Sequence, residues 1–204
     1  VPISATPQII GQNQLMINED ESVTIELTDL IVSDADDNYP QRFTLQVFPD
    51  PDNQYTVNKN TVTPGKNFNG FLTVIVRVKD KDNNPSNAFN LSILVNAVND
   101  APEITRLETT ALVYDHGAGP LVLTATLKLE DVDNDHVSFA GIRFGTENYR
   151  KGYDELLFTN TDNIRGVFDN ATGELSLIGY ATLTEYEGAI RAVTYTYHLI
   201  QDEQ

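Results

Sequence analysis

Short segments in which β-branched and aromatic residues alternate with polar residues recur along the whole chain. Residues 71–79 (FLTVIVRVK) and 136–144 (HVSFAGIRF) are two examples. Successive side chains of a β-strand point to opposite faces, so a period of two residues is typical of strands with one buried face. Turn-forming Asp, Asn, Gly and Pro residues lie between the segments. The pattern predicts an all-β protein, with strands over residues 21–27, 42–48, 71–79, 88–95, 119–129, 136–144, 155–158, 164–168, 174–179 and 191–200.

Two short stretches in the second half add detail to this pattern. Residues 169–174 (DNATGE) predict a tight hairpin in which Gly173 takes positive φ. Thr184 and Glu187 have the spacing of a capping box, a motif that begins helices. We therefore expect one helical turn over residues 187–193, crossing between two strands.

The midpoint of the chain reads NAVNDAP (residues 96–102) and directly follows an expected strand. Pro102 lacks a backbone donor and favours extended geometry at Ala101, so the strand ends and the chain continues without reversing. A chain of 204 residues is long enough for two cores. We predict two tandem domains, residues 1–100 and 101–204, joined by a short extended linker.

The charge of the chain restricts its partners. The formal net charge is −17, with 13 acidic and 6 basic residues in the first hundred positions and 17 and 7 in the remainder. A field of this sign repels nucleic acid and anionic lipid and attracts cations. We therefore expect no nucleic-acid partner.

Several other classes of protein are disfavoured by what the sequence lacks. It has no apolar run long enough to span a bilayer, so we expect no membrane insertion. It opens without a signal-peptide pattern, and we expect it to be a fragment of a longer protein. It has no cysteine, which rules out disulfides, thiolate metal sites and a cysteine nucleophile. It also has no G-x-S-x-G, P-loop or G-x-G-x-x-G motif, and we expect no enzyme.

Carboxylates are concentrated in the turns next to the expected strands. The stretch DADD (residues 34–37) follows one strand of the first half, and DVDND (residues 131–135) follows one of the second. A D-x-D pair in extended chain points both carboxylates to one side. At about 4 Å they repel by about 4 kcal/mol at an effective dielectric of about 20. Ca²⁺ would relieve this repulsion because it prefers oxygen ligands, whereas zinc and copper prefer the thiolates and imidazoles that are absent or scarce here.

Loops of an immunoglobulin-like sandwich alternate between the two ends of the domain. This places the loop at Glu19, together with Asn67, at the end where the chain leaves the first domain, next to the first acidic loop of the second. Asp115 and Asp154 are expected at the far end of the second domain. The expected calcium ligands are Glu19, Asp20, Asn99, Asp100, Asp131, Asp133 and Asp135 at the joint, and Asp34, Asp36, Asp80 and Asp82 at the entry end of the first domain.

Five motifs in order resemble the cadherin-like repeat of bacterial type: NED (18–20), D-x-D (34–36), NFNG (67–70), DKDNN (80–84) and VNAVNDAP (95–102). The resemblance covers about residues 7–102, and the second half looks like a variant repeat with fewer acidic motifs. Such repeats occur in tandem in large surface and adhesin proteins. The resemblance implies two immunoglobulin/cadherin-like Greek-key β-sandwiches in tandem, stiffened by calcium.

The resulting expectation is a calcium-binding structural or adhesive tandem repeat of an exported, extracellular cell-surface protein. Its partners would be neighbouring repeats of the same protein and a cell-surface protein or glycan. The alternative is a carbohydrate- or protein-binding module that uses calcium or an aromatic face directly. The aromatic residues available for such a face are Tyr180, Tyr186, Tyr195 and Tyr197.

Overall fold

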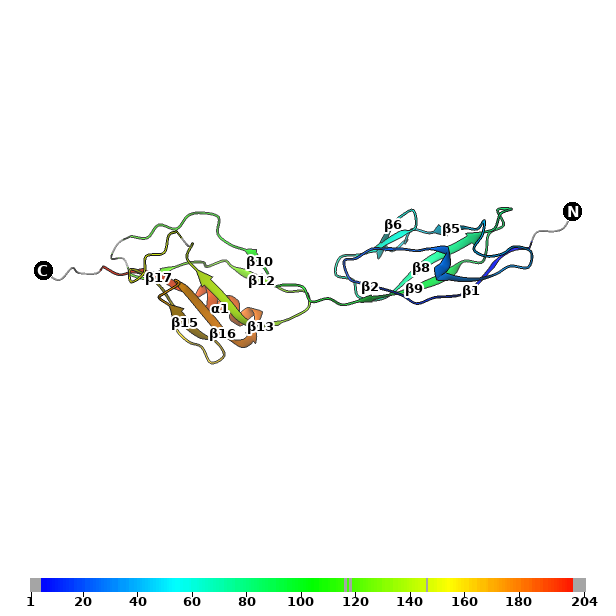
Figure 1. Cartoon of the computed structure of the whole chain (residues 1–204). Coiled ribbons are helices and arrows are strands. Elements are labelled where there is room, and N and C mark those ends of the chain that lie inside the picture. Colours follow the sequence, from blue (N-terminus) through cyan, green and yellow to red (C-terminus); the bar gives the residue numbers. More distant parts are fainter. Residues whose placement is uncertain (1–4, 116, 118, 146, 200–204) are drawn as a thin grey trace. The chain divides into compact units, whose positions relative to one another are not determined.

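The computed structural model describes residues 5–115, 117, 119–145 and 147–199. The chain divides into two compact units, Val1–Asn99 (unit 1) and Asp100–Gln204 (unit 2). Strands make up almost all of the regular structure in both units (Figure 1). The expected all-β class, with β-sandwich domains in tandem, is therefore confirmed.

Unit 1 has the strand order of an immunoglobulin-like sandwich. One sheet has the order β2 (Leu15–Asn18), β9 (Phe89–Asn96), β8 (Gly70–Lys79) and β5 (Thr44–Val47). The other has the order β3 (Val23–Thr24), β7 (Thr61–Pro64) and β6 (Tyr55–Asn58), while β1 (Gln8–Gln12) pairs with β4 (Leu30–Ser33). β3, β6 and β7 thus lie in one sheet and β5, β8 and β9 in the other, as in the immunoglobulin fold.

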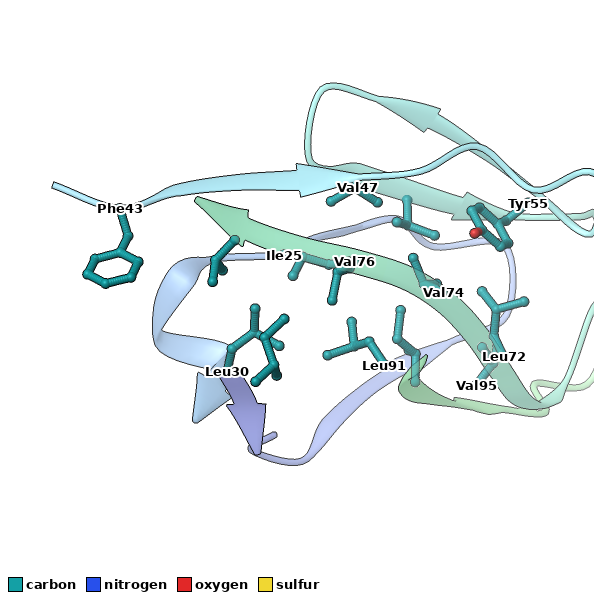
Figure 2. Packing of buried hydrophobic residues seen from close by; sticks show 14 residues of the cluster. Ile25, Leu30, Phe43, Val47, Tyr55, Leu72, Val74, Val76, Leu91 and Val95 are labelled. Atoms are coloured by element: carbon teal, nitrogen blue, oxygen red, sulfur yellow. The ribbon is translucent and has the colours of Figure 1, made fainter. Parts of the chain in front are cut away.

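Side chains from both sheets form the core of unit 1. Along β8, Leu72, Val74 and Val76 are fully buried, and the residues between them face outward. Figure 2 shows these side chains in the same interior as Ile25 and as Tyr55 of β6. Burying one Val or Leu side chain contributes about 1.5–3 kcal/mol. The alternation that predicts the strands is therefore also what holds the two sheets together.

The chain crosses from one sheet to the other between β1 and β2. β1 is antiparallel to β4, whereas β2 runs parallel to β9. The side chain of Gln12 bridges the crossing, since its Nε2 donates to the carbonyl oxygen of Ser92 at 2.7 Å and its Oε1 accepts from the Ser92 amide at 2.7 Å. The Gln12 amide thus replaces a missing backbone partner of β9.

The described residues of unit 2 form smaller sheets and one helix. β10 (Glu103–Arg106) pairs with β12 (Lys128–Glu130), and a second sheet has the order β11 (Leu121–Val122), β17 (Thr194–Tyr197) and β14 (Asp154–Leu157). A third has the order β13 (His136–Arg143), β16 (Glu174–Thr182) and β15 (Arg165–Asp169). The predicted hairpin at residues 169–174 joins β15 to β16, and Gly173 has a φ of 72°.

The helix of unit 2, α1 (Leu183–Arg191), begins four residues before the predicted segment of residues 187–193 and is longer than one turn. Thr182 is the N-cap: its Oγ1 accepts from the Glu185 amide at 3.2 Å, and Glu185 Oε2 accepts from the Thr182 amide at 2.8 Å. The predicted capping box of Thr184 and Glu187 is wrong. Starting at Thr182 turns Tyr186 into the core, and this burial selects one of the two T-x-x-E frames in the sequence TLTEYE. In the described part of the chain, no helix is long and apolar enough to cross a membrane.

Two predicted strands are interrupted by side chains that bind backbone amides. Residues 21–27 form a strand only at Val23–Thr24, because Asp29 Oδ2 accepts from the Glu26 amide at 2.7 Å and a 3₁₀ turn follows over Leu27–Asp29. Residues 119–129 divide into β11 and β12, which join different sheets. Between them, Glu108 Oε1 accepts from the amides of residues 125 and 126 at 2.7 and 3.0 Å. These amides are therefore not available for strand pairing.

Candidate metal sites

Five aspartates of unit 1, Asp34, Asp36, Asp37, Asp80 and Asp82, lie in the loops that follow β4 and β8, and we call them the Asp34 cluster. One carboxylate oxygen from each of the first three lies within 4.8 Å of the others. Asp34 Oδ1 accepts from the backbone amides of Asp36 at 3.0 Å and Asp37 at 3.1 Å. Asp34 Oδ2 is buried and has no hydrogen-bond partner among the described residues. An oxygen in this state fits a cation ligand.

The loop after β8 contributes the most deeply buried carboxylate of the cluster. Asp80 Oδ1 accepts from the amides of Asp82 and Asn84, each at 2.8 Å, and Oδ2 accepts from Asn84 Nδ2 at 2.7 Å. Burial raises the pKa of Asp80, but these hydrogen bonds outweigh it and the pKa lies below its ordinary value. The pKa of Asp34 is lowered in the same way, and the Asp80 carboxylate opposes that change. Asp34 and Asp80 therefore stay ionised at neutral pH.

A lysine already neutralises part of the Asp34 cluster. Lys81 Nζ lies 2.7 Å from both carboxylate oxygens of Asp37 and 3.2 Å from Asp82 Oδ2. Asp82, an expected ligand, is thus engaged by an ammonium group. Asp34, Asp36 and Asp80 are the better candidates for holding a cation, because no described ion pair involves them.

The opposite end of unit 1 contains a second set of oxygens, formed by Glu19, Asp20 and Asn67 (the Glu19 group). Glu19 is 5% exposed; its amide donates to the Asn96 carbonyl at 2.9 Å, and its Oε1 accepts from the Val98 amide. Its Oε2 is buried without a hydrogen-bond partner in the described part of the chain. Asp20 Oδ1 accepts from the Asn67 amide at 2.9 Å. The expected meeting of the Glu19 loop with Asn67 is found.

Asn67 supplies a further oxygen that suits a cation. Its Oδ1 is buried, and no hydrogen-bond partner for it occurs within the described ranges. Its φ is 57°, a left-handed conformation that Asn tolerates better than most residues. The backbone is thus shaped to bring this amide oxygen beside the loop of Glu19.

The acidic loop of unit 2 (residues 131–135) is held by its own carboxylates. Asp131 Oδ1 accepts from the amides of Asp133 and Asn134, each at 2.9 Å. Asp133 Oδ2 accepts from the Asp100 amide at 2.5 Å, which fixes the first residue of unit 2 to this loop. Asp135 instead pairs with His136 Nδ1 at 2.6 Å, and this contact lowers the pKa of Asp135. Asp131 and Asp133 are therefore better candidate ligands than Asp135.

The far end of unit 2 has an internal cation. Asp154 is buried, and its Oδ1 accepts from Tyr195 Oη at 2.7 Å and lies 3.4 Å from Arg150 Nη2. Burial and the neighbouring Asp154 raise the pKa of Tyr195 to about 12. Asp115 lies on the surface, and no contact in the described structure joins it to Asp154. The guanidinium of Arg150 occupies the role that a metal ion would have there.

Of the tyrosines considered for an aromatic face, only Tyr180 is well exposed, at 75%. Its ring stacks on His136 with a centroid distance of 4.8 Å. Tyr186 is fully buried, and Tyr195 and Tyr197 are partly buried. These four residues do not form one exposed face.

The sequence did not indicate which lysine and arginine side chains pair with the candidate carboxylates in each unit. Arg150 and Lys81 lie in turns whose course the strand pattern does not fix, so their carboxylate partners could not be chosen from many acidic residues. The sequence did contain one usable indication: Asn84 follows Asp80 by four residues, and its side-chain amide donates the hydrogen bond that orients the Asp80 carboxylate.

Comparisons with known proteins give only distant similarities. No protein-family model matches the chain, and no curated protein matches it. Among solved structures, the chain is similar to extracellular cadherin domains 1–4 of protocadherin gamma B7, with 16% identity over 90% of this chain and 43% of that one (TM-score 0.35). It is also similar to the D00–D0 domain of intimin, with 18% identity over 86% of each chain (TM-score 0.27). The chain spans less than half of the protocadherin chain, and at these TM-scores the fold assignment rests on the strand order described above.

Proposed function

We propose that this chain is a calcium-binding structural and adhesive module of an exported cell-surface protein, in which calcium stiffens the segment joining its two units. One observation carries the proposal. Oε2 of Glu19 is buried, and none of the described residues donates a hydrogen bond to it. A buried anion without a partner costs several kcal/mol, on the order of the binding energy of a weak cation site. A bound cation removes this cost.

The joining segment is attached to acidic groups on both sides. Val98 donates its amide to Glu19 in unit 1, and Asp100 donates its amide to Asp133 in unit 2. Only Asn99 separates these two attachment points along the chain. Ions held by the Glu19 group and by the acidic loop of unit 2 would both restrict the same three residues. This is how calcium binding would convert a flexible connection into a stiff one.

The chemistry of these oxygens favours calcium over other cations. The Glu19 group offers carboxylate and amide oxygens, and the loop of unit 2 offers the carboxylates of Asp131 and Asp133. Calcium accepts such mixed sets in flexible geometry, and extracellular modules bind it with dissociation constants of about 10⁻⁴ to 10⁻³ M. A site in this range is filled in millimolar calcium and empty in the cytosol.

A calcium titration by calorimetry on the whole chain tests this proposal. We expect binding in the submillimolar to millimolar range, and we expect the double variant Asp131→Asn/Asp133→Asn to lose part of the bound calcium. Asp162→Asn is the control, since Asp162 is an exposed loop residue of the same unit outside the acidic loop. A wild-type chain that takes up no calcium, or equal losses in the control, contradicts the proposal.

A glycan-binding role is the alternative, favoured by the exposed Tyr180 and its stacking on His136. A glycan-binding assay on the whole chain, with and without calcium, distinguishes the two functions. Glycan binding that persists after calcium is chelated and disappears in Tyr180→Ala would favour the alternative.

A further inference from the structure

Lys81 lies within the Asp34 cluster as a cation that the chain itself provides. Its ammonium nitrogen contacts both carboxylate oxygens of Asp37 at 2.7 Å and Asp82 Oδ2 at 3.2 Å. The side chains of Lys81 and Asp37 are only 34% and 14% exposed, and salt screens a partly buried ion pair less than one on an open surface. The hydrogen bonds to Asp37 raise the pKa of Lys81 above its ordinary value, so the ammonium group stays charged at neutral pH.

Asp37 is also one of the residues that a bound metal ion would use. Asp34, Asp36 and Asp37 each place one carboxylate oxygen within 4.8 Å of the others. In this set, Asp34 Oδ2 is buried and has no hydrogen-bond partner among the described residues. Calcium takes about six to eight oxygen ligands, so an ion beside Asp34 gains from the Asp37 carboxylate as well. Calcium and the ammonium group of Lys81 therefore compete for the same carboxylate.

The two loops of the cluster are already joined without a metal ion. Asp34 Oδ1 and Asp80 Oδ1 each accept hydrogen bonds from two backbone amides of their own loop. The ion pair then connects the loops to each other, because Asp37 follows β4 and Lys81 follows β8. The Glu19 group differs in this respect, since no described cation pairs with Glu19.

We propose that Lys81 is a tethered competitor of calcium, which raises the calcium concentration at which the Asp34 cluster fills. While the ion pair is formed, Asp37 is engaged and the ammonium charge repels a second cation. A site that is competent for only part of the time has its apparent affinity reduced by the competent fraction. An ion pair that is formed about nine-tenths of the time therefore weakens calcium binding about tenfold.

This inference rests on the proposed function in one respect, because it takes calcium to be the ion that unit 1 binds. It concerns a different site from the segment that joins the units, and each site has backbone amides that report on it. The amides of residues 36 and 37 donate to Asp34 in the cluster. The amides of Val98 and Asp100 donate to carboxylates at the joining segment.

A calcium titration of the whole chain, followed by the NMR shifts of these amides, measures the two sites separately. In Lys81→Met, the calcium concentration that half-saturates the cluster should fall at least about tenfold, and that of the joining segment should stay unchanged. Lys81→Arg keeps a cation at this position and should retain most of the wild-type value. Lys79→Met is the matched control, because it removes the same charge at the end of β8 and no described ion pair involves Lys79.

Thermal unfolding of the same variants distinguishes competition from a purely structural role of Lys81. In chelator, Lys81→Met should unfold at a lower temperature than the wild type, because its loops have lost the ion pair that joins them. Calcium should raise the unfolding temperature of this variant more than that of the wild type, since the variant binds calcium more tightly.

Three results would overturn the proposal: a Lys81→Met cluster that binds calcium no more tightly than the wild type, an equal change in Lys79→Met, or cluster amides that respond to calcium in neither chain. A failure of the proposed function looks different. In that case the cluster amides respond as expected, and the amides of Val98 and Asp100 do not respond to calcium.

Discussion

Glu19 is the residue through which the proposed calcium binding would act on the stability of unit 1. One carboxylate oxygen anchors the Val98 amide, and the other is buried without a partner among the residues that the structure describes. The first oxygen fixes where the chain leaves unit 1, and the second leaves a charge uncompensated. Under the proposed function, a bound cation would compensate this charge and stabilise the unit.

Glu19→Gln should therefore have effects of opposite sign with and without calcium. Gln can still accept from the Val98 amide but carries no charge, so in chelator the variant should be more stable than the wild type by about 1 kcal/mol. In calcium at 100 times the dissociation constant, the wild type gains about 2.7 kcal/mol that the variant largely loses. Thermal unfolding in both conditions measures this. Asp52→Asn, in an exposed turn of the same unit, is the control and should show no change of sign between the two conditions. A Glu19→Gln variant that is less stable than the wild type in both conditions would contradict this interpretation.

At the scale of elements, β16 depends on a glycine. Gly179 has a φ of 149°, and a Cβ added there would lie 1.9 Å from the Asn163 carbonyl oxygen. Gly179→Ala should destabilise unit 2 by at least about 2 kcal/mol, because both the backbone and the neighbouring chain must move.

Gly188→Ala provides the matched comparison in the adjoining element. Gly188 is an exposed residue of α1, and an added Cβ would meet nothing within 4 Å. The substitution should stabilise unit 2 by about 0.5–1 kcal/mol through helix propensity. Chemical denaturation of both variants measures the two changes. A Gly179→Ala variant as stable as the wild type would show that the close approach of Asn163 is not maintained in solution.

The sequence predicts best those strands in which buried and exposed side chains alternate along the whole length. β8 and β9 match the predicted residues 71–79 and 88–95 within one residue, since each buries every second side chain. The prediction was wrong where a carboxylate binds backbone amides, as Glu108 does between β11 and β12. β1 and β2 were not predicted as strands, because the chain changes sheet at Gln12 and neither piece is long enough to show a period. The same reasoning placed the loop of Asp20 beside Asn67 correctly but could not show that Lys81 neutralises Asp37.

At the scale of the whole molecule, the two units balance their buried carboxylates differently. In unit 2, Asp154 lies beside Arg150, and Glu187 contacts Lys128 at 2.7 Å and Arg191 at 2.9 Å. In unit 1, no described cation pairs with Glu19. Unit 2 thus supplies counter-ions for these buried carboxylates, whereas under the proposed function Glu19 of unit 1 would take a cation from solution.

Removing calcium should therefore affect the units unequally. A chelator should lower the unfolding temperature of unit 1 more than that of unit 2, and differential scanning calorimetry measures both transitions. Leu177→Ala assigns the transitions, because Leu177 is fully buried in unit 2 and its truncation costs about 2–5 kcal/mol there. A larger shift of the transition that Leu177→Ala moves would show that unit 2 is the calcium-dependent one.

The parallel pairing of β2 with β9 would have a mechanical consequence in the cell-surface protein proposed above. Tension enters unit 1 ahead of β2 and leaves it after β9, and these two strands are neighbours that run in the same direction. Pulling on the chain therefore drives them to slide past one another, and all the bonds of their ladder bear the load together. Strands pulled apart from one end would break those bonds one after another. The sheet is arranged to withstand traction along the chain.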